Sequence, residues 1–277
     1  MPRFRMLALD IDGTLVNSRD EVSAATADAL GSAAAAGIRV VLATGRRYSR
    51  TVPLVEPLGI DTPLITAGGA LVKTPRDHHT VFRAQFAAAT LLRTLRLIAA
   101  LGHYPLVCAD TYALGFDFYQ PPPANLNSET EEYLQLNPGE GRILDDFFER
   151  PPEAFAAFVL GTKHQMLALE AALAAALPEE LALHVLRSPR YRGYFCEIAP
   201  AGVTKWSAVR RIARMYGFGD EEICAVGDDV NDLPMIRGAG LGVAMGNAVE
   251  AVKQAADRVA PAHDDDGLAE IVGWLID

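Results

Sequence analysis

The sequence predicts a mixed α/β protein, in which a doubly wound, mostly parallel sheet holds a second, smaller α/β domain as an insertion. Both ends of the chain alternate short apolar strand patterns with helical patterns, as βαβ units covered on both faces do. The middle of the chain is set apart by the proline-rich stretches YQPPPANLNS and ERPPEAF. The predicted domains are therefore residues 1–83 together with 193–277, and residues 84–192.

The N-terminal part contains three apolar strand patterns separated by helical ones. Strands are predicted at 3–11 and 38–44, a strand, a glycine turn and a second strand within 62–72, and helices at 23–37 and 49–59. Ser23 is a plausible N-cap and Gly37 a stop for the first helix, whereas Pro53 is expected to interrupt the second. This alternation indicates parallel strands joined by helical crossovers.

The C-terminal part repeats the same alternation. Helices are predicted at 204–217, 231–240, 248–256 and 266–276, and strands at 221–229 and 241–246. The inserted part shows helical patterns at 88–101 and 163–177 and strand patterns at 104–110, 157–162, 181–187 and 191–199. Because both ends of the chain share one pattern, we expect them to form one sheet.

Composition limits the partners of the protein. The chain has 277 residues, of which 50% are hydrophobic, and its formal net charge is −10. The apolar content supports a sizeable core, and the negative charge argues against nucleic acid or an anionic membrane as a partner. The same charge repels phosphorylated compounds, so a phosphate site requires a cation or well-placed hydrogen-bond donors.

The cysteines and the N-terminus indicate a cytoplasmic protein. Cys108, Cys196 and Cys224 fit neither a zinc site nor a disulfide framework, and we expect them to be small buried hydrophobes. The first apolar run is broken by Asp10, too early for a signal peptide, and no run is long enough to span a membrane. The sequence leaves the oligomeric state open.

Four polar segments lie at the ends of predicted strands or at the start of a helix, where open α/β sheets bind ligands. The first is Asp10-Ile11-Asp12-Gly13-Thr14, which directly follows a strand. In an extended segment the carboxylates of Asp10 and Asp12 point to the same side, so this pair requires a cationic partner. Gly13 allows the backbone to turn away sharply.

The second and third segments offer donors for an anion. Thr44 and Gly45 place a hydroxyl beside a backbone N–H at a strand end, which suits a phosphoryl oxygen. Lys205 lies in the first turn of a helix that Thr204 can cap, where the helix dipole disfavours a cation unless an anion binds nearby. An ordinary turn and a solvated lysine remain the alternatives for these two segments.

The fourth segment gathers acidic residues behind a buried strand. Asp228, Asp229 and Asp232 lie within five residues, with Asn231 among them. Their spacing does not match a calcium-binding loop. Oxygen ligands that retain part of the hydration shell of the ion favour magnesium.

In order, the Asp-x-Asp-Gly-Thr, Thr-Gly-Arg, Lys and Gly-Asp-Asp-x-x-Asp segments resemble the four motifs of the haloacid dehalogenase superfamily of phosphohydrolases. The domain inserted between the second and third motifs and the C-terminal tail resemble its Cof-like branch. This resemblance implies a Rossmann-like core with an inserted α/β cap. It also implies a magnesium-dependent phosphatase acting on a small phosphorylated metabolite such as a sugar phosphate.

The resemblance further implies roles for individual residues. Asp10 would be the nucleophile that forms an aspartyl-phosphate, and Asp12 the general acid and then the general base. The phosphoryl group would be held by Thr44, Gly45, Lys205 and Asn231. Independently of the resemblance, Arg46 is a basic neighbour of Thr44 and a candidate to steer the phosphate.

The same resemblance implies a set of magnesium ligands. The carboxylates of Asp10 and Asp228 and the backbone carbonyl of Asp12 would hold the ion. Asp232 would support these ligands without touching the metal. The carboxylate of Asp12 would then stay free to exchange a proton.

Two positions depart from the Cof-like pattern. Gly68 stands where an asparagine is usual, and His263 with Asp264 stands where Asn-Asp is usual. We expect His263 to lie on the surface or at the edge of a substrate site, and residues 264–266 to form a solvated helix start.

Two alternative functions share this pattern of residues. A phosphomutase uses the same aspartyl-phosphate but returns the phosphoryl group to its substrate. A phosphorylatable receiver-type signalling domain also places acids, Thr and Lys at strand ends, but it predicts a much shorter chain without an inserted domain. Asp12 argues against the receiver, because it adds the acid–base step that promotes turnover.

Overall fold

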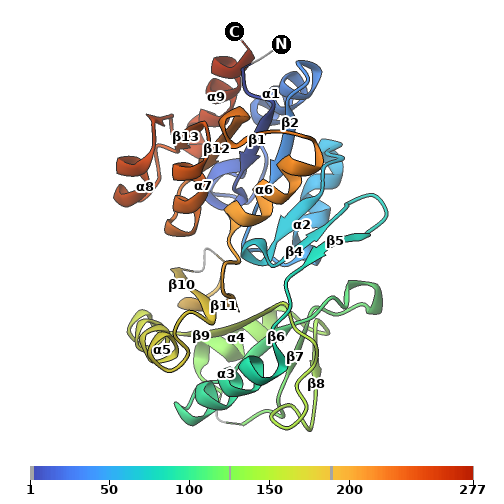
Figure 1. Cartoon of the computed structure of the whole chain (residues 1–277), viewed down its shortest axis with the longest axis vertical. Coiled ribbons are helices and arrows are strands. Elements are labelled where there is room, and N and C mark those ends of the chain that lie inside the picture. The colour runs from blue at the N-terminus through green and yellow to red at the C-terminus, as the bar shows by residue number, and fades with distance from the viewer. Residues whose placement is uncertain (1–2, 125, 188–189, 277) are drawn as a thin grey trace. The chain divides into compact units, whose positions relative to one another are not determined.

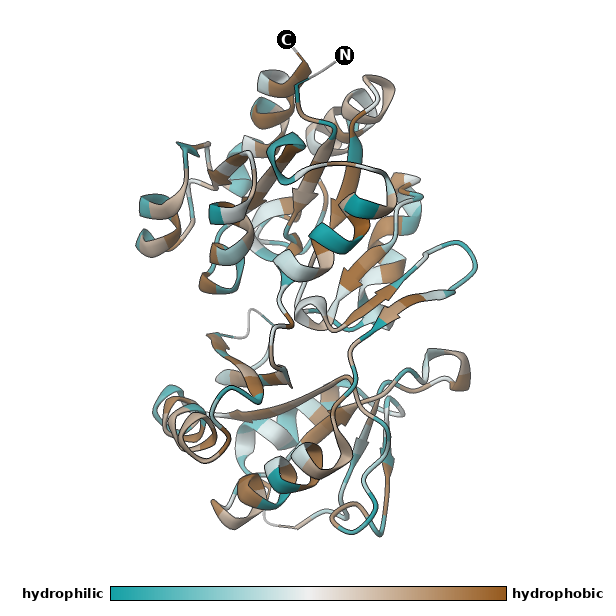
Figure 2. Cartoon of the chain, in the orientation of Figure 1, coloured by the Kyte–Doolittle hydropathy of each residue, from teal (hydrophilic) through white to brown (hydrophobic). Residues whose placement is uncertain are grey.

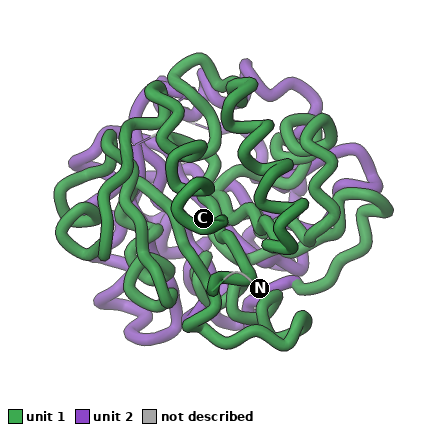
Figure 3. The backbone as a smooth tube through the Cα atoms, turned by 90° about the horizontal axis from the view of Figure 1, so that it is seen from above, with its two compact units in different colours: residues 1–82, 204–277 green, residues 83–203 purple. Residues whose placement is uncertain are grey.

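The computed structural model describes residues 3–124, 126–187 and 190–276, and the chain divides into two compact units (Figure 3). The first unit comprises residues 1–82 and 204–277, and the second comprises residues 83–203. The second unit extends beyond residue 192, the boundary expected from the sequence. Strand β11 (Tyr194–Pro200) explains this difference, because it pairs with two strands of the second unit.

The first unit is built on a five-stranded sheet (Figure 1). Its order is β14-β13-β12-β1-β2, and every pair in it is parallel. The strands are β1 (Met6–Leu9), β2 (Arg39–Leu42), β12 (Ile223–Gly227), β13 (Leu241–Ala244) and β14 (Arg258–Val259). The two ends of the chain therefore form one parallel sheet, as the sequence predicts, and β1 lies beside β12 because both strands are uniformly buried.

Six helices belong to the described part of this unit. They are α1 (Ala24–Ala35), α2 (Tyr48–Val55), α6 (Lys205–Met215), α7 (Leu233–Gly238), α8 (Glu250–Ala255) and α9 (Gly267–Ile276). A three-stranded sheet of β3 (Leu64–Thr66), β4 (Leu71–Lys73) and β5 (Thr80–Arg83) continues from the edge of the large one. An isolated parallel bridge between Ala43 and Ile65 joins the two sheets.

Helix α6 is held on one face of the large sheet by buried side chains. Val209 and Ile212 pack in one cluster with Met6 and Ala8 of β1. Because side chains alternate along a strand, this leaves Leu7 for the opposite face of the sheet. Figure 2 shows the result, in which the central strands are brown and α6 carries hydrophilic residues as well. The first residue of α6 is thereby placed at the carboxyl end of β1.

The second unit is a six-stranded, mostly antiparallel sheet packed against helices. Its order is β10-β11-β9-β6-β7-β8, and only β7 and β8 are parallel among its described pairs. Besides β11 the strands are β6 (Leu106–Cys108), β7 (Phe118–Gln120), β8 (Gly141–Ile143), β9 (Ala156–Gly161) and β10 (Leu181–Arg187). The helices are α3 (Ala88–Ala100), α4 (Ser128–Leu136) and α5 (Lys163–Ala176). This unit has its own core, in which Leu95, Val159 and Leu169 are buried.

The helix ends and the cysteines follow the sequence predictions in part. The hydroxyl of Ser23 accepts a hydrogen bond from the Thr26 amide and caps α1, as expected. Pro53 does not interrupt its helix, because α2 continues to Val55 and ends in a tight turn that contains Pro57. All three cysteines are buried and free, as expected. None of the helices in the described residues has the length and apolarity needed to cross a membrane.

We predict that Ile212→Ala weakens the first unit by about 2–5 kcal/mol, because it leaves a cavity beneath α6. The measurement is urea unfolding followed by tryptophan fluorescence, which reports on the first unit because both tryptophans, Trp206 and Trp274, lie in it. Met215→Ala on the same helix is the control, since that side chain is 58% exposed. Its effect is expected within about 0.5 kcal/mol. Equal effects of the two changes would contradict the packing of α6 described above.

Candidate active site

A buried lysine links two carboxylates at the carboxyl edge of the large sheet. The ammonium Nζ of Lys205 lies 2.7 Å from Oδ1 of Asp10 and 2.7 Å from Oδ1 of Asp232. Lys205 is the first residue of α6, and the Thr204 hydroxyl caps that helix by accepting from the Ser207 amide. Helix α6 therefore places the Lys205 side chain at the end of β1, where Asp10 directly follows the strand.

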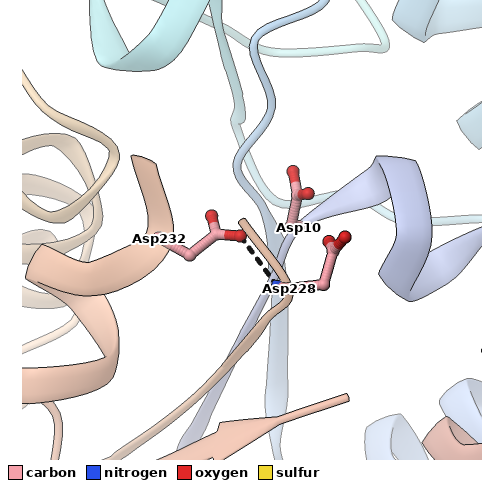
Figure 4. A group of neighbouring side chains, drawn as sticks. All are labelled: Asp10, Asp228 and Asp232. Atoms are coloured by element: carbon pink, nitrogen blue, oxygen red, sulfur yellow. Dashed lines mark hydrogen bonds between the residues drawn. The ribbon is translucent and has the colours of Figure 1, made fainter. Parts of the chain in front are cut away.

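The loop after β12 is organised around Asp232. Its Oδ2 accepts the backbone N–H groups of Asp228 at 2.9 Å and Asp229 at 3.1 Å, while its Oδ1 faces Lys205. The Asp228 carboxylate accepts a hydrogen bond from the Thr14 hydroxyl at 3.3 Å. Figure 4 shows the Asp10 and Asp228 side chains beside each other, with Asp232 reaching toward them from the following turn. Both oxygens of Asp232 are thus occupied within the protein.

Burial and crowding disturb the protonation of these groups. Burial raises the pKa of Asp10 well above its usual range, against the attraction of Lys205, and the neighbouring carboxylates raise it further. Burial, with the charge of Asp232 next, raises the pKa of Asp228 to about 7. Burial alone would lower the pKa of Lys205, but Asp10 and Asp232 reverse that effect and raise it. The site holds more negative charge than its single lysine offsets.

The donor set fits a divalent cation. Asp10, Asp228 and Asp232 each offer a carboxylate oxygen, and these three atoms lie within 4.8 Å of one another. No salt bridge to Asp228 is found among the described residues. The attraction of Lys205 and the hydrogen bond from Thr14 lower the pKa of Asp228, but burial and the neighbouring carboxylates outweigh them. Hard oxygen ligands of this kind suit magnesium. Since Asp232 already accepts from Lys205 and from two amides, Asp10 and Asp228 are the carboxylates better placed to bind an ion.

Asp12 is paired with an arginine rather than free. Nε of Arg46 lies 2.9 Å from one carboxylate oxygen of Asp12, and Nη2 lies 2.7 Å from the other. The same Nη2 contacts Asp20. Burial alone would lower the pKa of Arg46, but these two carboxylates raise it. Asp10 and Asp12 therefore have separate cationic partners, Lys205 and Arg46.

Thr44 and Asn231, two further residues expected to bind phosphate, contact Arg46 and Lys205. Thr44 is fully buried, and its hydroxyl oxygen accepts the backbone N–H of Arg46 at 3.0 Å, with Gly45 between them. The hydroxyl of Thr44 therefore retains its own proton to donate. Asn231 is buried, and its Oδ1 lies 3.4 Å from Nζ of Lys205. Lys205 thus lies within reach of both the first and the fourth motif.

Two glycines allow these segments to approach one another. Gly13 has a φ of 74°, and a Cβ there would clash with the carboxylate of Asp228. Gly69 has a φ of 107°, and a Cβ there would clash with the carbonyl of Thr204, directly before Lys205. Gly13 lies in a wide turn, Ile11–Leu15, which is closed by the Val16 N–H bonding to Ile11 O at 3.1 Å. A side chain at Gly13 would push the first motif away from the fourth, and one at Gly69 would push the third motif away from the loop after β3.

The departures near the C-terminus have structural partners that the sequence did not indicate. Nδ1 of His263 donates to the carbonyl of Val16 at 2.7 Å, which makes this histidine an anchor for the segment after the first motif. The carboxylate of Asp264 accepts the Ser18 amide at 2.8 Å. Residues 263–265 form a short 3-10 helix just before α9, and residues 264–266 are exposed, as expected for a solvated helix start. No local signal marks these contacts, because the partners lie at opposite ends of the chain.

Comparisons with known proteins show which family the chain matches. The family model of haloacid dehalogenase-like hydrolases matches residues 7–272. Phosphatase YwpJ of Bacillus subtilis is 29% identical to the chain, over 98% of this chain and 100% of YwpJ. Pyridoxal phosphate phosphatase YbhA of Escherichia coli is 27% identical, over 97% of both chains. A crystal structure of a haloacid dehalogenase-like hydrolase from Bacteroides thetaiotaomicron is 26% identical, with a TM-score of 0.79 over 98% of this chain and 99% of that one.

We predict that, in the presence of a chelator, the protein becomes less stable as the pH rises from about 4 through about 7. The folded chain binds a proton at Asp228 that the unfolded chain has already released, because the pKa of this group is raised to about 7. Its stabilising effect is therefore complete at low pH and lost as the pH rises through the folded pKa. The measurement is the Tm at about pH 5 and about pH 8, where each kcal/mol corresponds to roughly 2–4 °C.

Asp228→Asn should reduce this pH dependence of the Tm, because it removes the titrating group. Asp28→Asn, on the exposed face of α1, should leave the dependence unchanged. An unaltered pH dependence in Asp228→Asn would show that other groups cause it.

We also predict that Gly13→Ala lowers the affinity for Mg²⁺ at least about tenfold, because the new Cβ displaces the Asp228 carboxylate. The measurement is titration calorimetry with MgCl₂. Gly37→Ala is the matched control, since Gly37 also has a positive φ, 85°, but open space around the new Cβ. The two variants should lose similar stability through backbone strain, and only Gly13→Ala should lose magnesium affinity. Equal affinities in the two variants would disprove the steric argument.

Proposed function

The chain belongs to the haloacid dehalogenase-like hydrolase family and is a phosphatase of it, and on this premise we propose a specific reaction. The reaction is magnesium-dependent hydrolysis of a small phosphomonoester through an aspartyl-phosphate on Asp10. The observation that carries the proposal is the buried Asp10 carboxylate at the end of β1, bonded to Lys205 at 2.7 Å and beside Asp228.

In the first half of this reaction, Asp10 attacks the phosphorus atom of the substrate. A new O–P bond forms as the bond to the leaving alkoxide breaks. Asp12 supplies a proton to that alkoxide as it leaves. Lys205 touches Asp10, so its compact charge can offset the repulsion between the carboxylate and the phosphoryl oxygens.

In the second half, water attacks the phosphorus of the aspartyl-phosphate and releases inorganic phosphate. Asp12 accepts the proton of this water, and in the structure its carboxylate already accepts two hydrogen bonds from Arg46. The hydroxyl of Thr44, the amide of Gly45 and the side chain of Asn231 are proposed to hold the phosphoryl oxygens. Asp10 is regenerated, so the cycle is balanced.

Magnesium is the proposed cofactor. The carboxylates of Asp10 and Asp228 and the backbone carbonyl of Asp12 would hold the ion. When bound it would offset the negative charge of the substrate. Asp232 would position the loop of Asp228 and the ammonium of Lys205, and its contacts with both support this role.

The substrate is proposed to be a small phosphorylated metabolite, with sugar phosphates as the first compounds to test. The four motifs all lie in the first unit, so the second unit is proposed to carry the residues that select the leaving group. A family match that extends over both units disfavours the receiver-type alternative. A phosphomutase remains distinguishable by the fate of the phosphoryl group.

The test is phosphate release from a panel of phosphomonoesters with MgCl₂, with and without excess chelator. The wild type should release phosphate only with the metal, and Asp10→Asn should lose at least about 10³-fold in kcat. After rapid acid quenching, the wild type should carry one phosphoryl group on the peptide that contains Asp10. The control variant Asp28→Asn should retain full activity, since this side chain is exposed on α1.

Three outcomes of this test would contradict the proposal. An inactive wild type across the whole panel would refute the phosphatase reaction. Full activity of Asp10→Asn would refute the assigned nucleophile. Isomerised substrate without free phosphate, in the presence of a bisphosphate activator, would show a phosphomutase instead.

A further inference from the structure

A third carboxylate, outside the four motifs, reaches the acid–base residue through an arginine. We propose that Asp20 is a positioning residue, which holds Arg46 so that the guanidinium orients the carboxylate of Asp12 toward the leaving group. This inference rests on the proposed function, because it assigns Asp20 to the acid–base step of that reaction.

The geometry of the ion cluster supports this role. Arg46 uses Nε and Nη2 for the two oxygens of Asp12, and Nη2 also contacts Asp20. The Arg46 side chain is only 9% exposed, whereas Asp12 and Asp20 are about one-third exposed. A planar guanidinium bound by two carboxylates has little rotational freedom, so its contact with Asp12 has a defined direction.

The backbone holds Asp20 in place for this contact. Asn17 and Glu21 close a tight loop, with Asn17 N bonded to Glu21 O at 2.9 Å and Asp20 N to Asn17 O at 3.0 Å. The side chain of Asn17 also accepts the amides of Arg19 and Glu21. Asp20 has a φ of 64°, a left-handed conformation that glycine adopts with less strain. The chain thus places a carboxylate at a position where the backbone alone favours glycine.

The loop is also anchored from outside. Asp264 accepts the Ser18 amide at 2.8 Å, and Asp266 accepts the Ser23 hydroxyl at 2.6 Å. These anchors lie on both sides of Asp20 and belong to the same compact unit. Asp20 therefore belongs to a loop that hydrogen bonds hold on both sides, whereas Asp12 lies in the turn that follows β1. Through Arg46, this loop restrains the carboxylate of Asp12.

This arrangement predicts an effect on the first step that depends on the leaving group. A poor leaving group, such as an alkoxide, requires a correctly placed proton donor in the transition state, whereas a nitrophenolate leaves readily without one. Misplacing the Asp12 carboxylate should therefore slow phosphoryl transfer from alkyl phosphates more than from aryl phosphates. The quantity that reports on this step is kcat/KM, because it covers the events up to release of the leaving group.

The experiment compares kcat/KM of the wild type and Asp20→Asn, each loaded with MgCl₂, on an alkyl phosphate and on 4-nitrophenyl phosphate. The alkyl phosphate is chosen from the panel compounds that the wild type hydrolyses. Asp20→Asn should lose about tenfold on the alkyl phosphate and less than about twofold on the aryl phosphate. The matched control is Glu21→Gln, which removes the same charge from the same loop but loses only a contact with the exposed Arg19. This control should behave as wild type on both substrates.

Two further variants separate positioning from folding. Asp20→Gly relieves the left-handed backbone, which offsets part of the stability lost with the Arg46 contact, and it should show the same loss on alkyl phosphates while remaining folded. In an Arg46→Ala background, Asp20→Asn should cause no further loss, because Asp20 acts through Arg46.

The outcomes distinguish this inference from the proposed function. An active wild type whose rates are matched by Asp20→Asn and Asp20→Gly on both substrates would overturn the positioning role alone. Equal losses on alkyl and aryl phosphates would also overturn it, since they indicate a general structural effect. A wild type inactive on every phosphoester would overturn the proposed reaction, and the role of Asp20 with it.

Discussion

The buried ammonium group of Lys205 is the interaction on which the rest of the site depends. It joins Asp10, at the end of β1, to Asp232, in the loop after β12. Removing this cation would leave two buried carboxylates without compensation, which costs several kcal/mol. The cap of α6 at Thr204 and the close approach of Gly69 are therefore consequences of one requirement, that the first side chain of α6 reaches Asp10.

The carboxylates of the site differ because their cationic partners differ. Asp10 and Asp232 share Lys205, and Asp12 and Asp20 share Arg46. The Asp228 carboxylate accepts a hydrogen bond from Thr14, and burial, with the charge of Asp232 next, raises its pKa. This unequal distribution is consistent with the different roles proposed for the five acidic groups. It also explains why this edge of the sheet favours a divalent cation over further protein contacts.

Much of the fold could be predicted because its signals are local. The apolar runs around Leu7, Val41 and Val226 predict the buried parallel strands, and Ser23 and Thr204 cap helices where the sequence indicates. The local signals were less reliable at boundaries. Pro53 is accommodated inside α2, and β11 stays with the second unit because its hydrogen-bond partners, not its position in the sequence, decide where a strand belongs.

The sequence by itself determined which segments end at the carboxyl edge of the sheet, and hence that Asp10, Thr44 and Asp228 gather there, whereas the place of Lys205 beside them followed from the family resemblance. This follows from strand periodicity and from the parallel order of βαβ units. Only the tertiary structure decided how the charges pair, since the Lys205–Asp10 contact joins residues 195 positions apart and the Arg46–Asp20 contact joins residues 26 apart. Such pairings depend on distances of a few ångströms between packed elements, and no periodicity along the chain encodes those distances.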